Sequence, residues 1–267
     1  MQEQFWHYIA AVRAQAPLVQ NITNFVAMNN SANALLAVGA SPIMAHAHPE
    51  IEQMLAICQA LVVNIGTLDE YWSAAMRQAA AAAQHLGRPW VLDPVGAGAT
   101  PYRNSLLGQL LIHQPTIIRG NASEILALAG LNASATKGVD STAASTEALG
   151  AAQALSRQLG AVVCVSGATD LVVHGARRVE IDNGSPLMTK VTALGCSASA
   201  VLGAFAAVAP AEARLEAAAA GVALFSVAGE LAAEGAAGPG SLQVRLLDTL
   251  YSLTEADFTA RLRLRVC

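Results

Sequence analysis

The sequence predicts an α/β domain in which a mostly parallel sheet is covered by helices on both faces. Short runs rich in β-branched residues alternate along the chain with alanine-rich stretches at helical spacing. Alternation of strand and helix is typical of a parallel sheet that is wrapped on both sides. No linker rich in proline, serine or charge divides the 267 residues, which are enough to bury one large core. We therefore expect a single domain spanning residues 1–267.

The expected elements follow in order after an N-terminal segment that mixes acidic, aromatic and basic residues at helical spacing, unlike a signal peptide. Four buried strands, each followed by polar or glycine residues, are expected at Ala60–Ile65, Trp90–Leu92, Thr116–Ile118 and Ala161–Val165. Helices are expected at Tyr71–Leu86, Ser105–Ile112, Ser123–Ala129 and Thr142–Leu159. An antiparallel hairpin, Leu171–His174 with Arg178–Ile181, should turn at Gly175-Ala176, and the rest should be almost wholly helical.

The two most apolar windows are Ala200–Pro210 and Ala217–Gly229. Both are shorter than the roughly 20 residues that cross a bilayer, so we expect buried helices and no membrane partner.

Composition narrows the classes of function. Charged residues make up 13% of the chain and the formal net charge is −4, so there is no basic field for nucleic acid or anionic lipid. Low charge with abundant alanine predicts helix surfaces hidden between subunits, and hence a homo-oligomer. The cysteines Cys58, Cys164, Cys196 and Cys267 form no CxxC pair, which predicts neither a zinc site nor a disulfide framework. Reduced thiols predict a cytoplasmic protein.

Polar residues gather just after the expected strands, where an open parallel sheet binds its ligands. The segments concerned are Gly66-Thr67, Asp93–Gly98, Arg119–Glu124 and Ser166-Gly167. Each has an ordinary structural explanation on its own. Asn121 can cap a helix with Glu124 completing a capping box, and Asp93 and Gly96 are common turn residues. Capping and catalytic roles for Asn121 are compatible, and both stay open.

The chemistry of this set points to phosphoryl transfer. Arg119 and helix N-terminal amides suit an anionic ligand, while Asp93 and Glu124 offer oxygen ligands for magnesium, which bridges phosphates. Carboxylates beside a phosphate need such a cation because like charges repel. The chain has neither GxxxxGK[ST] nor a kinase-type GxGxxG, which excludes a P-loop and a protein-kinase site.

A cysteine near the start of a helix is the most informative single residue. Cys196 lies in Met188–Ala200, between a Thr-rich, strand-compatible lead-in and a small-residue helix expected to start at Ser197. Amides and the helix dipole there favour either a bound phosphate or the thiolate itself. The alternative is a small buried residue that packs the helix start, the usual role of an unpaired cysteine.

An ordered series of motifs resembles the hydroxyethylthiazole kinases of the ribokinase-like superfamily. The segments are Pro17–Met44, NIGTL (Asn64–Leu68), LDPVGAGAT (Leu92–Thr100), RGNASEI (Arg119–Ile125), GVDS (Gly138–Ser141), MTKVTALGC (Met188–Cys196) and GPGS (Gly238–Ser241). The resemblance implies a three-layer α/β/α fold and an ATP-dependent, magnesium-requiring phosphorylation of 4-methyl-5-(2-hydroxyethyl)thiazole, a salvage step toward thiamine. It also implies a homotrimer with active sites between subunits.

The resemblance assigns roles on the nucleotide side. Asn121 and Glu124 match the NxxE positions that organise magnesium and its waters, and Asp93 matches an acidic residue beside the metal. Arg119 matches a contact to the ATP phosphates, and Ser166 a Ser or Thr that touches the nucleotide, as Asn121 also should.

On the acceptor side, Met44 matches a thiazole contact, and Asn24 and Val26 should help form the same pocket. Met44 also suits a plain core position, although a thioether packs well against an aromatic ring. Gly195 and the following amides would form the anion hole. Cys196 falls where most ribokinase-like enzymes place an aspartate base, and it can act as a base or as a positioning contact.

The chain departs from the family pattern just before this cysteine, where Ala193 and Leu194 replace a glycine and its neighbour. A methyl group at Ala193 restricts conformations with positive φ and narrows the substrate pocket that this residue should line.

Three other functions stay open. The chain could be a ribokinase-like kinase for a pyrimidine alcohol, pyridoxal or a sugar. It could be an ADP-forming repair or dehydratase enzyme on the same fold. It could also be a non-catalytic thiazole- or thiamine-binding protein, which would have no use for a metal and phosphate set.

Overall fold

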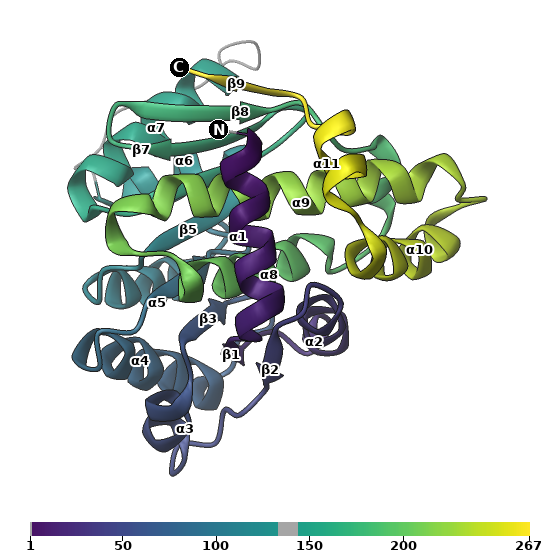
Figure 1. Cartoon of the computed structure of the whole chain (residues 1–267). Coiled ribbons are helices and arrows are strands. Elements are labelled where there is room, and N and C mark those ends of the chain that lie inside the picture. Colours follow the sequence, from purple (N-terminus) through teal and green to yellow (C-terminus); the bar gives the residue numbers. More distant parts are fainter. Residues whose placement is uncertain (1, 133–143) are drawn as a thin grey trace.

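A single sheet forms the middle layer of the chain in the computed structural model, which describes residues 2–132 and 144–267 (Figure 1). Within these residues the strands are β1 (Leu18–Ile22), β2 (Ser41–Ile43), β3 (Ala60–Asn64), β4 (Trp90–Asp93), β5 (Ile117–Asn121), β6 (Val162–Ser166), β7 (Asp170–His174), β8 (Arg177–Ile181) and β9 (Leu264–Val266). Their order is β2-β1-β3-β4-β5-β6-β7-β8-β9. Pairing is parallel from β2 to β6 and antiparallel from β6 to β9, as a mostly parallel sheet requires.

Helices cover both faces, which confirms the expected three layers. One face carries α1 (Gln2–Gln15), α2 (Met28–Ala37), α8 (Leu194–Val208), α9 (Arg214–Glu234), α10 (Pro239–Ser252) and α11 (Glu255–Arg261). The other carries α3 (Ile51–Ile57), α4 (Glu70–His85), α5 (Pro101–Leu111), α6 (Ala122–Asn132) and α7 (Ala144–Leu159). Figure 1 shows α1, α8 and α9 crossing the near face of the sheet.

Alternation along the strands builds a separate core on each face. Val62 and Val91 pack with the helices of the first face, whereas their neighbours Val63 and Leu92 pack with those of the second. Gly203 in α8 is pressed against the sheet, because a Cβ there would lie 2.5 Å from Cγ2 of Val62. The central helix α8 therefore lies directly on the strands that carry the polar residues at their ends.

The expected strands and helices are confirmed, with ends that shift by a few residues. Strands β1, β2 and β9 were not predicted from the sequence. In β1 the buried Gln20 and Asn21 interrupt the apolar run that signals a central strand, although both side chains are at most 1% exposed. The predicted helix Thr142–Leu159 is described from Ala144 onward, and the motif Gly138–Ser141 lies outside the described residues.

The start of α8 differs from the prediction. The helix begins at Leu194, not Ser197, and the strand-compatible lead-in contains a 3₁₀ helix, η1 (Pro186–Lys190). The physical reason is Ala193, whose φ of 63° turns the chain sharply into the helix. Cys196 consequently lies within the first turn.

The expectation that every apolar helix is too short to cross a membrane is wrong. Among the described residues, one stretch, Ala211–Glu234, is long and apolar enough to cross a membrane by length and composition. In the fold, 83% of its apolar window is buried, so α9 is a core helix by packing rather than by length.

We predict that Ala193→Gly raises the free energy of unfolding by about 0.5 to 1 kcal/mol, because glycine adopts the left-handed conformation without a Cβ penalty. The matched control is Ala207→Gly in the last turn of α8, which should lower it by up to about 1 kcal/mol. Urea unfolding of the two variants and the parent measures both effects. A loss of stability in Ala193→Gly would contradict the left-handed turn.

Candidate active site

The parallel register brings the predicted polar residues to one edge of the sheet. Asn64 at the end of β3 pairs with Asp93 at the end of β4, and Asn121 of β5 pairs with Ser166 of β6. Arg119 lies two residues before Asn121 on the same strand. Four chain segments that are far apart in sequence thus end side by side, as the sequence analysis expected.

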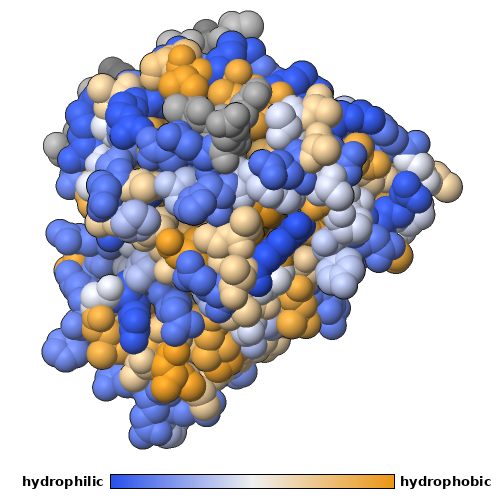
Figure 2. Space-filling view, in the orientation of Figure 1, coloured by the Kyte–Doolittle hydropathy of each residue, from blue (hydrophilic) through white to orange (hydrophobic). Residues whose placement is uncertain are grey.

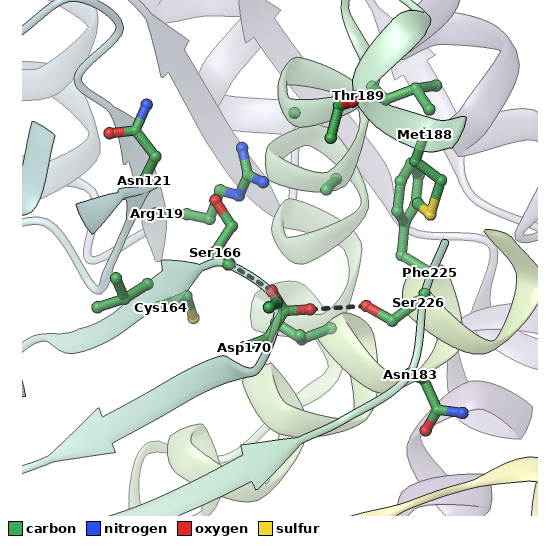
Figure 3. Close-up of a pocket in the computed structure, with 18 of the residues that line it drawn as sticks. Arg119, Asn121, Cys164, Ser166, Asp170, Asn183, Met188, Thr189, Phe225 and Ser226 are labelled. Atoms are coloured by element: carbon green, nitrogen blue, oxygen red, sulfur yellow. Dashed lines mark hydrogen bonds between the residues drawn. The ribbon is translucent and has the colours of Figure 1, made fainter. Parts of the chain in front are cut away.

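A cavity of about 730 Å³ opens at this edge (Figure 3). The predicted site residues that line it are Arg119, Asn121, Ser166, Ala193 and Gly195. Figure 3 shows Arg119 and Ser166 close together on the strand side of the pocket, and Met188 and Phe225 on the opposite side. The pocket therefore has a cationic, polar end and an apolar wall, which suits a ligand with an anionic part and a flat apolar part.

Arg119 carries the positive charge of this pocket. Among the described residues no hydrogen bond or ion pair engages its guanidinium. It packs directly against the start of α8, because a Cβ added to Gly195 would lie 2.6 Å from Nη1 of Arg119. A free guanidinium beside the first amides of a helix is a strong site for a phosphate.

Asn121 and Glu124 form the capping box that the sequence suggested. The Glu124 amide donates to Oδ1 of Asn121 at 2.9 Å, and the Asn121 amide donates to Oε2 of Glu124 at 2.8 Å. The other carboxylate oxygen, Oε1, accepts from the Gly96 amide at 3.0 Å. Glu124 thus ties the start of α6 to the loop after β4, while its oxygens keep lone pairs for a further ligand.

Asp93 is buried, with 2% of its surface exposed. Its Oδ2 accepts hydrogen bonds from Asn64 at 2.6 Å and from Ser199 at 2.7 Å. Burial raises the pKa of Asp93 to about 6, against the lowering effects of Arg119 and of these hydrogen bonds. Oδ1 receives no hydrogen bond from the residues that the structure describes, which leaves it available to a cation.

The carboxylates of Asp93 and Glu124 fit magnesium only if substrate phosphates complete its coordination. Within residues 2–132 and 144–267, no three His, Cys, Asp or Glu side chains lie close enough to hold a metal by themselves. Magnesium commonly uses one or two carboxylates, water and substrate phosphates. Asp93 and Glu124, beside an arginine-lined pocket, provide that kind of partial shell.

Cys196 is partly buried in the first turn of α8, and Asn24 donates a hydrogen bond to its sulfur at 3.3 Å. Burial, followed by the negative charge of Asp93, raises the pKa of this thiol, although Asn24, Asn64 and Arg119 pull it down. Burial therefore opposes the suggestion that the helix start favours a thiolate at Cys196, because removal of water disfavours the charged sulfur.

Of the residues predicted for the acceptor pocket, Ala193 and Gly195 line this cavity, whereas Asn24, Val26 and Met44 do not. Asn24 and Val26 follow β1, and Met44 follows β2, with Val26 57% exposed and Met44 partly buried. Asn24 links the two regions through its contact with Cys196. The structure therefore places Met44, Asn24 and Val26 just after the paired strands β1 and β2, at the β2 end of the strand order.

Sequence reasoning missed three groups near the site. Asn64 ends β3 and bridges Asn24 and Asp93, and its position at a strand end was the available signal. Asp170, a partly buried residue that lines the pocket, accepts from Ser226 at 2.7 Å and from the Gly167 amide at 3.0 Å, and burial raises its pKa.

The third missed group is aromatic and lies beside the predicted acceptor pocket. Trp72 stacks on His46 with ring centroids 4.2 Å apart and meets Phe25 edge-on at 5.2 Å. No sequence pattern joins these three positions, because they come from three different segments.

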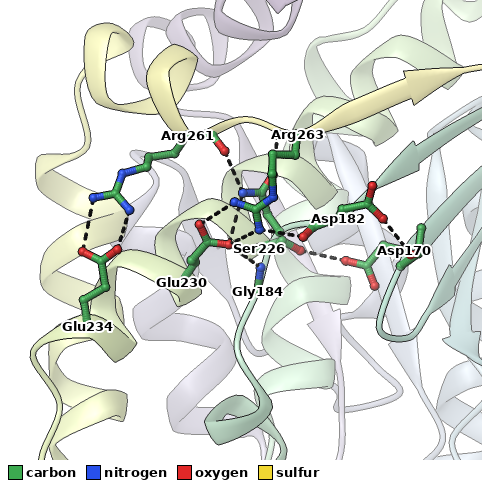
Figure 4. A network of polar contacts seen from close by, with 10 residues as sticks. Asp170, Asp182, Gly184, Ser226, Glu230, Glu234, Arg261 and Arg263 are labelled. Atoms are coloured by element: carbon green, nitrogen blue, oxygen red, sulfur yellow. Dashed lines mark hydrogen bonds and ion pairs between the residues drawn. The ribbon is translucent and has the colours of Figure 1, made fainter.

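The outer wall of the pocket is held by an ion-pair network (Figure 4). Arg263 donates to both oxygens of Glu230, at 2.9 and 2.6 Å, and Glu230 also accepts from the Gly184 amide at 3.1 Å. Asn183 donates to Glu230 and to the carbonyl of Arg261. The hydrogen bonds from Arg263 lower the pKa of Glu230, and the network anchors the Asn183–Pro186 segment that lines the cavity.

Comparison with known proteins agrees with this architecture. The profile of the hydroxyethylthiazole kinase family matches residues 9–256. The chain therefore belongs to the hydroxyethylthiazole kinase family. Curated relatives of that name include one from Syntrophus aciditrophicus, 54% identical over 98% of this chain and 97% of its own length. A second, from Zea mays, is 48% identical over 97% of this chain and 92% of its own.

Solved structures give the same result at the level of the fold. A hydroxyethylthiazole kinase protein from Pyrococcus horikoshii is 40% identical and superposes with a TM-score of 0.92, covering 99% of both chains. A ribokinase-like superfamily protein from Enterococcus faecalis, 13% identical with a TM-score of 0.63 over 91% of this chain and 88% of its own, shares the fold alone. This hydroxyethylthiazole kinase family member thus has the ribokinase-like fold that the motifs implied.

We predict that the buried carboxyl of Asp93 makes stability depend on pH. Its folded-state pKa is raised to about 6, so the folded state binds a proton that the unfolded state has already lost. Stability should fall as pH rises through 6, by about 1 kcal/mol between pH 5 and pH 8.

Urea unfolding of the ligand-free protein at both pH values, with and without Asp93→Asn, isolates this contribution. Ser199→Ala removes a hydrogen bond to the carboxylate and should steepen the dependence. An identical pH dependence in the parent and in Asp93→Asn would show that Asp93 titrates normally.

Proposed function

We propose that the chain transfers the γ-phosphoryl group of ATP to the hydroxyl of 4-methyl-5-(2-hydroxyethyl)thiazole, a salvage step toward thiamine, as one kinase domain of residues 1–267. The observation that carries this proposal is the guanidinium of Arg119, which has no hydrogen-bond or ion-pair partner in residues 2–132 and 144–267 and packs against Gly195 at the start of α8. Cys196 follows directly in the same turn. An anion site adjoining a side chain that can contact the acceptor hydroxyl suits a transfer from phosphate to alcohol.

The cavity accounts for the nucleotide. Its polar end, with Arg119, Asn121 and Ser166, suits the phosphates, and the apolar wall around Met188 and Phe225 suits a purine base. The network behind Asn183 keeps that wall in place. The identity of the acceptor alcohol in this proposal is inferred from the names of the relatives.

Magnesium would be held by Asp93 and Glu124 together with the nucleotide phosphates. When bound, it would neutralise charge on the transferring group. This assignment is supported by Oδ1 of Asp93, which accepts no hydrogen bond from the described part of the chain, and by the lone pairs left on the Glu124 oxygens.

Catalysis would depend mainly on positioning. A loose phosphoryl transition state needs little early deprotonation of the alcohol, so a neutral thiol at Cys196 is compatible with transfer. The raised pKa of this thiol favours a positioning contact over a strong base. Gly195 and the neighbouring amides would stabilise the oxygens of the transferring group.

The acceptor pocket would be completed by a second subunit of a homotrimer. Phe25 and Val26, beside the predicted thiazole contacts, are 60% and 57% exposed in the single chain. Further exposed apolar residues on neighbouring segments are Leu36, Ile57 and Tyr71. Figure 2 shows hydrophobic residues at the surface in the lower part of the view, where Figure 1 places α2, α3 and α4. Covering such a surface favours association.

A cytoplasmic location is part of the proposal. All four cysteines are free, and two of them are buried.

The central prediction is ADP release that requires the thiazole alcohol, ATP and magnesium together. A coupled assay with a panel of alcohols, including pyridoxal, a pyrimidine alcohol and a sugar, measures the selectivity. Omission of magnesium should abolish turnover. Binding of the alcohol without turnover in any mixture would favour the non-catalytic binding protein instead.

Gly195→Ala should weaken ATP binding by roughly tenfold or more, because the new methyl would displace the Arg119 guanidinium from the anion site. Calorimetric titration with ATP measures the dissociation constant. Gly108→Ala is the matched control, since a Cβ there meets nothing within 4 Å in α5. Equal ATP affinity in Gly195→Ala and Gly108→Ala would remove Arg119 from the phosphate site.

Phe25→Ser should shift the protein from trimer toward smaller species, because it removes apolar area from the proposed interface. Sedimentation velocity measures the change. Ile112→Ser is the control: this side chain is 70% exposed but lies after α5, at the amino-terminal edge of the sheet. A parent that sediments as a monomer would disprove the shared pocket.

A further inference from the structure

A chain of hydrogen bonds runs from Asp93 to Cys196 through two buried asparagines. Asn64 donates to Oδ2 of Asp93 at 2.6 Å, and Asn24 donates to Oδ1 of Asn64 at 2.8 Å. The same amide nitrogen of Asn24 donates to the sulfur of Cys196 at 3.3 Å. Asn64 is 1% and Asn24 5% exposed, so water does not compete freely for these bonds.

The orientation of the Asn64 amide is determined from both of its ends. An ionised carboxylate only accepts hydrogen bonds, so the nitrogen of Asn64 must face Asp93. A backbone amide only donates, and the amide of Gly66 points at Oδ1 of Asn64 at 3.0 Å. Both neighbours demand the same orientation, so the oxygen of Asn64 must face Asn24.

The orientation of the Asn24 amide follows in the same way. The backbone amide of Ala27 donates to Oδ1 of Asn24 at 3.0 Å, so the nitrogen faces inward. One hydrogen of that nitrogen goes to Oδ1 of Asn64, and the second goes to the sulfur of Cys196. The sulfur is therefore an acceptor on this side in either protonation state.

We propose that Asn64 is a positioning residue that holds Asn24 as a hydrogen-bond donor to Cys196, so that the thiol's own hydrogen is directed away from Asn24 toward the acceptor alcohol. This inference rests on the proposed function, which places that alcohol beside Cys196. It gives Asn24 a role toward the sulfur in addition to the pocket-forming role expected from the motifs.

The packing around Asn24 supports the same role. A Cβ at Gly66 would lie 2.6 Å from Nδ2 of Asn24, so glycine is the residue that lets Asn24 reach the sulfur. Burial and the negative charge of Asp93 raise the pKa of the thiol. Hydrogen bonds from Asn24 and Asn64 and the charge of Arg119 lower it. The two asparagines thus partly offset the rise in the thiol pKa that burial near a carboxylate causes.

The reactivity of Cys196 in the ligand-free protein tests the inference without any kinase assay. The parent carries Cys267→Ser, which removes the exposed thiol, while Cys58 and Cys164 are buried. The rate of alkylation by iodoacetamide at pH 8 is followed by mass spectrometry of the Cys196 peptide. Asn24→Ala should slow it by up to about tenfold, which corresponds to one pKa unit, and Asn64→Ala should slow it by a smaller factor.

Two further variants separate positioning from loss of structure. Asn21→Ala removes an equally buried asparagine of β1 whose side-chain amide donates to the carbonyl of Val19, and it should leave the rate unchanged. Gly66→Ala displaces Asn24 while both bonding groups of Asn64 stay, and it should slow alkylation as Asn24→Ala does. An unchanged rate in Asn24→Ala and Gly66→Ala, with melting temperatures showing folded protein, would overturn the proposal.

Steady-state kinetics test the positioning role of Asn64 independently. With thiazole alcohol and ATP, Asn64→Ala should lower kcat with little change in KM, because it disturbs the orientation of the thiol and not the binding surface. A raised KM with unchanged kcat would overturn the positioning role. If the parent phosphorylates none of the alcohols, the proposed function fails, and the alkylation series still decides whether the asparagines orient Cys196.

Discussion

The parallel pairing of β3, β4, β5 and β6 is the constraint on which the site depends. Because parallel strands end at the same edge, Asn64, Asp93, Asn121 and Ser166 become neighbours although about a hundred residues of sequence separate the first from the last. The helix α8 then lies across these strands and brings its first turn to the same edge. A shift of one residue in any strand would turn its polar end residue to the other face of the sheet.

Burial has the largest effect on the pKa of Asp93 at the ligand-binding edge of the sheet. Asp93 is almost fully enclosed and keeps a raised pKa even though Arg119 and two hydrogen bonds favour its charged form. Arg119 has no carboxylate partner of its own among the described residues. In the ligand-free protein, the positive charge of Arg119 is thus not neutralised by an ion pair with the described residues, and the carboxyl of Asp93 has a raised pKa. Both properties suit a site whose charges are completed by a nucleotide and a cation.

Residues that carry motifs were identified from the sequence, and residues that orient them were not. Asp93, Arg119, Asn121 and Glu124 have the residue types that phosphate chemistry requires, and they follow visible strands. Asn64 also ends a strand, but an asparagine there has many ordinary roles. Its importance depends on the directions of its two hydrogen bonds, which only a three-dimensional arrangement defines.

The sequence by itself determined the layer architecture, the mostly parallel character of the sheet and the family, because hydrophobic periodicity and ordered motifs are local properties of the chain. The tertiary structure alone decided that β1 is an interior strand despite Gln20 and Asn21, that α8 begins directly after a left-handed Ala193, and that burial raises the pKa of Cys196. These properties depend on burial and on partners distant in sequence, since desolvation and long-range contacts can override local preference.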